Sequence, residues 1–274
     1  IIFEESDSLS TQNKSAVVKS LKVYNPTVAI GGKNAPSTEE IKYLTKYNVN
    51  AQQRCVTLKD YKAKVMQMPP KYGCPFRCNV VEDNNKVSMS MLGLNANGNL
   101  TSILPLTLIE NIIEYLSNYK SLTDYVEIRS GKIFNIGIEM DVFIDKNYIT
   151  HDVVSSIINL VNEYFKVEKH DMGGEIFIGD VEKEINSLDG VISMIDFRVY
   201  AIYGGTYSKD ICPLPKVEQN SMCNTTTKEP MKIKDANTFQ IDINTTDRVL
   251  YNDYDSMFEI KNPKTDIKVR VKTR

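Results

Sequence analysis

Residues 134–145 read Phe-Asn-Ile-Gly-Ile-Glu-Met-Asp-Val-Phe-Ile-Asp, and this stretch decides the fold class. Its apolar residues recur at every second position without a break. Most of the intervening positions are polar, among them Asn135, Glu139 and Asp141. A period of two over this length predicts a half-buried β-strand whose polar row faces solvent.

The chain after this strand continues with two helical patterns and a second strand. A helix is predicted from Thr150, where apolar residues recur four apart, and a shorter helix is predicted from Asp180. Asp189-Gly190 then turns the chain into another alternating run at 195–203. Strand, helix, helix and strand, each with one apolar side, predict an α+β arrangement in which a sheet is covered by helices.

The chain before this strand predicts further helices and strands. A helix is expected at 36–47, and Thr57 is a good N-cap for another at 58–68, which Pro69-Pro70 would end. Two strands around a turn at 82–85 and a helix at 106–119 follow. The sequence leaves open whether these elements extend the same sheet or form a neighbouring layer.

The predicted fold class is therefore α+β, with mixed sheets covered by helices and a short β-rich C-terminal segment. Residues 208–230 are rich in Pro, Ser, Thr and Asn and predict a loop, and short strand-like runs follow it. We divide the chain into an N-terminal segment with a helical motif (1–75), an α+β part (76–207), and a loop with the β-rich segment (208–274).

The composition excludes some classes of partner. The chain has 33 Lys and Arg residues against 35 Asp and Glu residues, so its net charge is −2 and no overall basic field attracts nucleic acid. No apolar run approaches the roughly 18 residues that a membrane-spanning helix needs. The first residue is Ile1 rather than Met, inside a strand-like run, which suggests a fragment or a processed product.

The five cysteines do not form a convincing metal or disulfide pattern. An odd number at scattered spacings, without a signal peptide, indicates a reducing compartment. Cys74 and Cys78 form a Cys-x3-Cys unit, but Cys212 and Cys223 lack the tight spacing of a second zinc-binding pair. We expect small buried thiols rather than zinc.

No reactive site emerges from the remaining polar residues. The Gly31-Gly32 pair lacks the other positions of a phosphate-binding loop and is interpreted as a turn. His151 and His170 lie at opposite ends of one predicted helix, so they cannot share a site there and are interpreted as solvated. The carboxylates near the end of the long strand could bind a divalent cation, but a solvent-facing row explains them as well. No catalytic, cofactor-binding or metal-binding residue is predicted.

One long stretch resembles a known family. It contains Asn25-Pro26, Gly31-Gly32, Glu39-Glu40-Ile41, Ala51-Gln52, Arg54, Val56-Thr57 and Asp60-Tyr61, in that order. This series resembles the baseplate wedge proteins of contractile-tailed, T-even-type phages, in the J-like family. Two other stretches are also similar to that family: the run from Gly174 through Asp189-Gly190 to Phe197, and 256–267, with its Phe258-Glu259-Ile260 strand.

The resemblance implies a structural virion protein and no enzyme. Such a protein would be assembled in the host cytoplasm and become part of the tail baseplate. There it would form a dimer within a wedge, contact other wedge, sheath-initiating and hub proteins, and belong to a ring that rearranges on tail contraction. It would need no cofactor, nucleic acid or membrane. The residues expected to maintain its geometry or assembly are Asn25, Pro26, Gly31, Gly32, Arg54, Thr57, Asp60, Tyr61, Gly190, Phe258, Glu259 and Ile260, the last three as a strand that could extend a partner's sheet.

Two other functions stay open at this point. A receptor- or carbohydrate-binding tail module is possible for a virion protein, although helices between strands are not typical of adhesins. A virion hydrolase would need a pair of acid and base residues in a cleft, which the sequence does not suggest. The chain departs from the wedge family at Cys55, in the Cys-rich stretch around Pro75, and in the insertion at 208–230.

Overall fold

The computed structural model describes residues 54–84, 86–210, 235–241 and 248–273, together with positions 38, 41, 42, 45, 233 and 243. The predictions at Asn25, Pro26, Gly31 and Gly32, and most of the 208–230 loop, lie outside these residues. The four described positions of the predicted 36–47 helix are helical. The fold is α+β, with mixed sheets packed against helices, as predicted.

The first half of the molecule is a four-stranded sheet with two helices. Its elements are α3 (Leu58–Met66), the short 3-10 helix η1 (Pro70–Tyr72), β1 (Arg77–Asp83), β2 (Lys86–Leu94), β3 (Leu100–Thr101), α4 (Leu106–Ser117) and β4 (Val126–Ser130). The central strand β2 pairs antiparallel with β1 and parallel with β4. Apolar side chains of α3 and α4 pack against β1 and β2 in one cluster. These elements form a separate sheet, which answers the question that the sequence left open.

The second half contains a five-stranded sheet centred on β5. Its elements are β5 (Lys132–Ile144), α5 (Thr150–Tyr164), β6 (Ile176–Phe177), α6 (Ile178–Asn186), β7 (Val191–Tyr203), β8 (Asn237–Ile241), β9 (Val249–Leu250), β10 (Ser256–Glu259), α7 (Pro263–Asp266) and β11 (Ile267–Thr273). Strand β7 pairs antiparallel with β5, whereas β10 and β11 both pair parallel with it. Strands β8, β10 and β11 of the 208–274 segment thus join the five-stranded sheet, β9 pairs with β6 in a small separate sheet, and our three-part division stays a prediction.

Helices α5 and α6 bury one apolar side each against this second sheet. The side chains of Val153, Ile157 and Val161 from α5 pack with Val181 and Ile185 from α6 and with the apolar row of β5. The spacing of three and four residues is what places these side chains on one helix face. The positions that predicted these helices are therefore the ones that form the core.

The polar row of β5 is buried, and the prediction that it faces solvent was wrong. Asn135 and Glu139 are only 2% and 3% exposed. Arg198 from β7 and Arg270 from β11 form ion pairs with Glu139, and Tyr200 donates its hydroxyl to the same carboxylate at 3.2 Å. Side chains from both neighbouring strands therefore cover this face.

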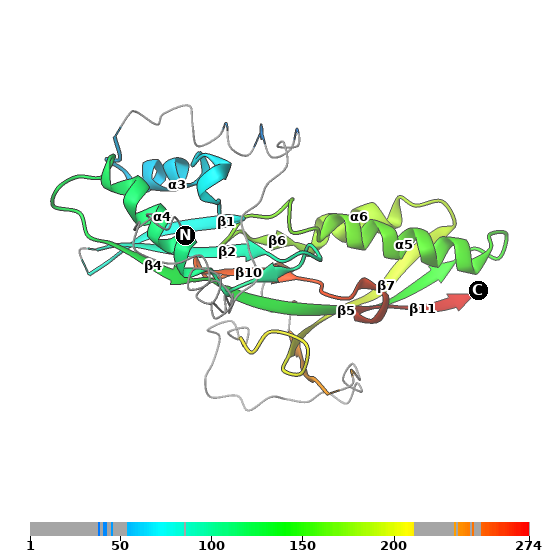
Figure 1. The fold of residues 1–274 in the computed structure, drawn as a ribbon. Helices are drawn as coiled ribbons and strands as arrows, with labels where there is room; N and C mark the ends of the chain where they lie inside the picture. The colour runs from blue at the N-terminus through cyan, green and yellow to red at the C-terminus, as the bar shows by residue number, and fades with distance from the viewer. Residues whose placement is uncertain are drawn as a thin grey trace, which may run out of the picture.

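Strands β4 and β5 form one extended path through both sheets (Figure 1). Residues 126–144 span about 60 Å at roughly 3.3 Å per residue. Gly131 lies where the path leaves the first sheet, and its amide donates to Met91 O at 2.8 Å. A Cβ at Gly131 would lie 2.9 Å from Leu92 Cγ and from Met172 Cε, so only glycine fits here without displacing those side chains. The two halves are therefore connected by one continuous run of extended chain, which is closely packed at Gly131.

Candidate functional site

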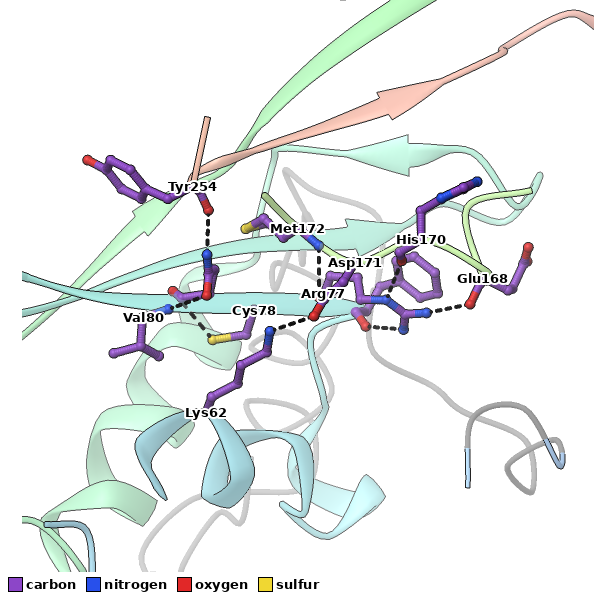
Figure 2. Close-up of polar contacts among 11 residues, drawn as sticks. Lys62, Arg77, Cys78, Val80, Glu168, His170, Asp171, Met172 and Tyr254 are labelled. Carbon is purple, nitrogen blue, oxygen red and sulfur yellow. Dashed lines mark hydrogen bonds and ion pairs between the residues drawn. The ribbon is translucent and has the colours of Figure 1, made fainter. Parts of the chain in front are cut away.

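Buried polar and apolar contacts connect the two sheets, and they form the candidate site. We call this region the joint. Its apolar centre combines residues from both halves: Leu92, Leu100, Ile133, Val167, Met172 and Met257. Around this centre, charged side chains from α3 and β1 reach the segment that follows α5 (Figure 2). The joint therefore links elements about a hundred residues apart in the sequence.

Arg77 is the main polar contact of the joint. It lies on β1, is 2% exposed, and its guanidinium lies 4.2 Å from the centroid of the Phe76 ring. Its Nε donates to His170 O at 3.1 Å and its Nη2 donates to Glu168 O at 2.8 Å, while Nη1 donates to Phe76 O at 3.1 Å. Because a guanidinium presents its donors in a rigid plane, it can bind several carbonyls at once and fix the segment between them.

A second contact connects helix α3 to the same segment. Lys62 Nζ lies 2.9 Å from Asp171 Oδ2, and the lysine side chain is almost fully buried. The other oxygen of Asp171 accepts a hydrogen bond from the Met172 amide at 2.8 Å. The Asp171 carboxylate therefore contacts Lys62 of α3 with one oxygen and the Met172 amide with the other. These two contacts fix the orientation of the carboxylate.

The segment around Tyr254 supplies a third set of contacts. Asn79 on β1 donates from Nδ2 to Tyr254 O at 2.8 Å. The Gly173 amide donates to Ser256 O at 3.0 Å. Strand β1 therefore contacts both the segment that follows α5 and the segment that precedes β10.

His170 belongs to the joint, so our interpretation of it as a solvated helix-end histidine was wrong. Its ring packs beside Tyr164 and Phe165, and Nε2 lies 2.8 Å from Tyr164 O. Burial lowers the pKa of His170, so the neutral ring with its proton on Nε2 fits this contact. His151, by contrast, is exposed near the start of α5, as predicted.

The motif residues at 54–61 lie at the start of α3, whereas Ile41 lies in the earlier helical stretch. Thr57 is the N-cap of this helix, and with Asp60 it forms a capping box, as the sequence predicted for the cap. The Thr57 amide donates to Asp60 Oδ2 at 2.8 Å. Burial would raise the pKa of Asp60, but the amide hydrogen bonds from Thr57 and Val56 outweigh it and lower that pKa. Arg54 is exposed beside this cap, and its expected role stays a prediction.

Tyr61 extends the motif into the core of the first half. Its ring is buried, and its hydroxyl donates to Asp124 Oδ2 at 2.5 Å, across the cluster beneath α3 and α4. Burial, reinforced by the Asp124 carboxylate, raises the pKa of the Tyr61 hydroxyl. The tyrosine therefore stays protonated and connects α3 to the segment between α4 and β4.

Replacing Tyr61 by phenylalanine is expected to lower the free energy of unfolding by about 1–2 kcal/mol, because a charge-assisted hydrogen bond is lost while the ring still packs. Urea unfolding followed by circular dichroism measures the change. Tyr72→Phe is the matched control, because Tyr72 is partly exposed. Equal stability of the two variants would show that the Tyr61 hydroxyl does not contribute.

The other predicted site residues lie far from this cap. Gly190 has a φ of +87° in the turn before β7, and a Cβ there would lie 2.8 Å from Tyr148 Cγ. Phe258 and Glu259 are buried in β10, which pairs with β5 of the same chain. Strand β10 thus belongs to this chain's own sheet, and the expectation that it extends a partner's sheet stays a prediction.

Glu259 is a buried carboxylate between three elements. It accepts hydrogen bonds from the Leu100 amide at 2.6 Å and from Asn135 Nδ2 at 2.9 Å. Burial raises the pKa of Glu259, although these two hydrogen bonds act in the opposite direction. Asn135 Oδ1 also accepts a hydrogen bond from the Ser208 amide at 2.7 Å. Hydrogen bonds to both Nδ2 and Oδ1 therefore fix the orientation of the Asn135 side-chain amide.

The raised pKa of Glu259 predicts a pH dependence of stability. Between its ordinary value of 4.5 and the higher folded-state value, the folded protein binds more protons than the unfolded chain. The Glu259 contribution to the free energy of unfolding should therefore fall as pH rises through this range. Glu259→Gln should remove this slope in urea unfolding measured from pH 4 to pH 8. Glu110→Gln, on the exposed surface of α4, should retain it, and the same slope in both variants would contradict the assignment.

The cysteines and acidic residues do not assemble into a metal centre within the described part of the chain. Burial raises the pKa of Cys55 to about 11 and that of Cys78 to about 12, so both are protonated thiols near neutral pH. No group of three or more potential ligands that could hold an ion occurs among the described residues. In the same residues, no helix has the length and apolar character needed to cross a membrane.

A hollow of about 250 Å³ lies beside β7, away from the joint. Its charged lining consists of Glu182, Asp196 and Arg248, and Arg248 forms an ion pair with Glu182. Asp196 lies 3.6 Å from Arg198 Nη1. Charge neutralisation within the fold accounts for these groups.

Comparisons with known proteins assign no family to the chain. No protein-family model and no curated protein matches the chain. Among solved structures, it is similar to a chain of the anti-feeding prophage baseplate, determined by cryo-EM with sixfold symmetrisation. The TM-score is 0.43 at 12% sequence identity, and the match covers 58% of this chain and 37% of that one. The match therefore spans well under half of that chain, and a likeness at this level carries no conclusion about function.

Proposed function

We propose that this chain is a structural subunit of the tail baseplate of a contractile-tailed phage, within the wedge. The observation that carries the proposal is the use of the wedge-like motif. Thr57 and Asp60 cap helix α3, and Tyr61 connects that helix to Asp124. These residues of the wedge-like motif therefore stabilise the fold.

The joint supports a mechanical role. The continuous β4–β5 path, the buried Arg77 and the Lys62–Asp171 ion pair hold the two sheets together as a single body. A ring that switches between two arrangements needs subunits that rotate or slide as rigid pieces, because packed interfaces are bistable and do not deform continuously. A rigid two-sheet body meets this requirement.

The proposal extends to location and partners. The subunit is assembled in the host cytoplasm and becomes part of the virion. It dimerises within a wedge and contacts other wedge, sheath-initiating and hub proteins, in a ring that widens when the tail contracts. These points rest on the sequence resemblance to the T-even-type, J-like family.

Immunogold labelling of phage particles from the source lysate tests this proposal. An antibody raised against the purified chain is applied to intact and to contracted particles, which are then viewed by electron microscopy. Label at the distal end of the tail, displaced outward in contracted particles, is the expected result. Label on fibres would favour the receptor-binding alternative, and label on heads or on no particle would contradict a tail role.

A further inference from the structure

Helix α4 has an apolar stripe that the other described residues leave largely exposed. Leu108, Ile112 and Leu116 point into the core of the first half and are fully or nearly fully buried. On the outer side, Leu106 is 67% exposed and Ile113 is 47% exposed. Ile109, which is partly buried, lies between them at a spacing of three and then four residues, so the outer apolar residues follow one line along the helix.

Helices α5 and α6 do not share this property. Among the described residues of α5 and α6, no large apolar side chain is exposed, and the outward positions are mainly charged or polar. A surface helix of a globular protein usually has one apolar side, and a helix that is apolar on two sides is usually covered on both. A line of outward apolar residues is therefore absent from α5 and α6, while single exposed apolar residues occur at other helical positions, Ile41 and Leu58.

The charges of α4 indicate what could cover it. Its sequence, Leu-Thr-Leu-Ile-Glu-Asn-Ile-Ile-Glu-Tyr-Leu-Ser, contains two acidic residues and no basic residue. At about 100° per residue, Glu110 lies about 40° and Glu114 about 80° around the helix from Leu106, on the side of the stripe away from the core. Both glutamates are exposed. An apolar line with acidic residues on one side complements an apolar line with basic residues beside it.

We propose that the outer stripe of α4, formed by Leu106, Ile109 and Ile113, is the docking surface for an amphipathic helix of a partner protein. The partner helix carries apolar residues along one side and lysine or arginine beside them. The stripe runs from Leu106 to Ile113, about 12 Å at 1.5 Å per residue, and matches about two turns of such a helix. A second copy of α4 is a poorer occupant, because it would bring the same two glutamates to the interface.

This inference rests on the surface of α4 alone and does not depend on the baseplate proposal. The test uses the full chain and two designed three-heptad helical peptides as probes. Both peptides carry leucine along one seam, and the residues beside the seam are lysine in one peptide and glutamate in the other. Binding is measured by fluorescence anisotropy against the wild type and against L106S/I113S, E110K/E114K and, as a matched control on α5, S156A/N159S.

The lysine peptide should bind the wild type at least about tenfold more tightly than the glutamate peptide. L106S/I113S should weaken its binding about tenfold or more, E110K/E114K should reverse the preference between the peptides, and S156A/N159S should change neither. Circular dichroism and the urea midpoint verify that each variant is folded. Absent binding, or binding that L106S/I113S leaves unchanged, would overturn the proposal. A full-chain dimer that L106S/I113S dissociates in light scattering would also overturn it, because a second copy would then cover α4.

Discussion

Replacing Arg198 by alanine is expected to lower the free energy of unfolding by about 3–5 kcal/mol, since Glu139 and Asp141 would lose a buried charge partner and retain only the exposed Arg270 and Lys272. Arg198 Nη2 lies 3.0 Å from Asp141 Oδ1, and Nε lies 3.9 Å from Glu139 Oε2. The side chains of Arg198 and Glu139 are 5% and 4% exposed, so water cannot replace the lost guanidinium. Urea unfolding at neutral pH, with the slope and the midpoint fitted together, measures the loss.

Arg270→Ala provides the matched control for Arg198. Arg270 pairs with the same Glu139, but its side chain is 59% exposed, so its loss should cost no more than about 1 kcal/mol. Adding Glu139→Gln to Arg198→Ala should recover part of the stability, because one uncompensated charge is removed. Equal losses for Arg198→Ala and Arg270→Ala would contradict the view that burial of the polar row of β5 makes this network important.

Replacing Arg77 by alanine should have the second-largest effect, a loss of about 2–4 kcal/mol. The two backbone carbonyls of the joint that it binds, at Glu168 and His170, would lose charge-assisted hydrogen bonds in a buried place. Arg77→Lys should recover only a small part, because an ammonium group cannot reproduce the planar arrangement of donors. Urea unfolding measures the global loss, and hydrogen exchange should show faster opening of residues 166–172.

The control for Arg77 is Arg129→Ala in β4. Arg129 also has several polar partners, Glu127 and Asp83, but all of them lie on the surface. Its replacement should leave the urea midpoint and the exchange of residues 166–172 unchanged. If Arg77→Ala behaved like Arg129→Ala, the joint would not depend on the guanidinium.

Much of the secondary structure could be predicted from the sequence, because side-chain periodicity reports one buried face of each element. The alternation in β5 and the four-residue spacing in α5 locate both elements correctly. The same alternation failed to predict that the polar row of β5 is buried. Its cover comes from Arg198 and Arg270, which are distant in sequence, and a local pattern contains no information about them.

The joint could not be predicted for a related reason. Arg77 binds backbone carbonyls, which every residue has, so no residue type marks its acceptors in the sequence. The available signals were indirect: an arginine between Phe76 and Cys78 in a strand-like run, and a glycine at position 131 between two strands. The motif at 54–61 predicted a helix cap correctly, because a cap depends on residues only three apart.

Native-state hydrogen exchange of the wild-type chain tests the single-body claim most directly. The amides of β2 lie at the centre of the first sheet, and those of β5 at the centre of the second. If the joint makes one cooperative unit, the slowest amides of both strands should exchange with the same free energy of opening, equal to that of global unfolding. A clearly lower opening free energy for β2 than for β5, or the reverse, would mean that the halves open separately and would contradict the claim.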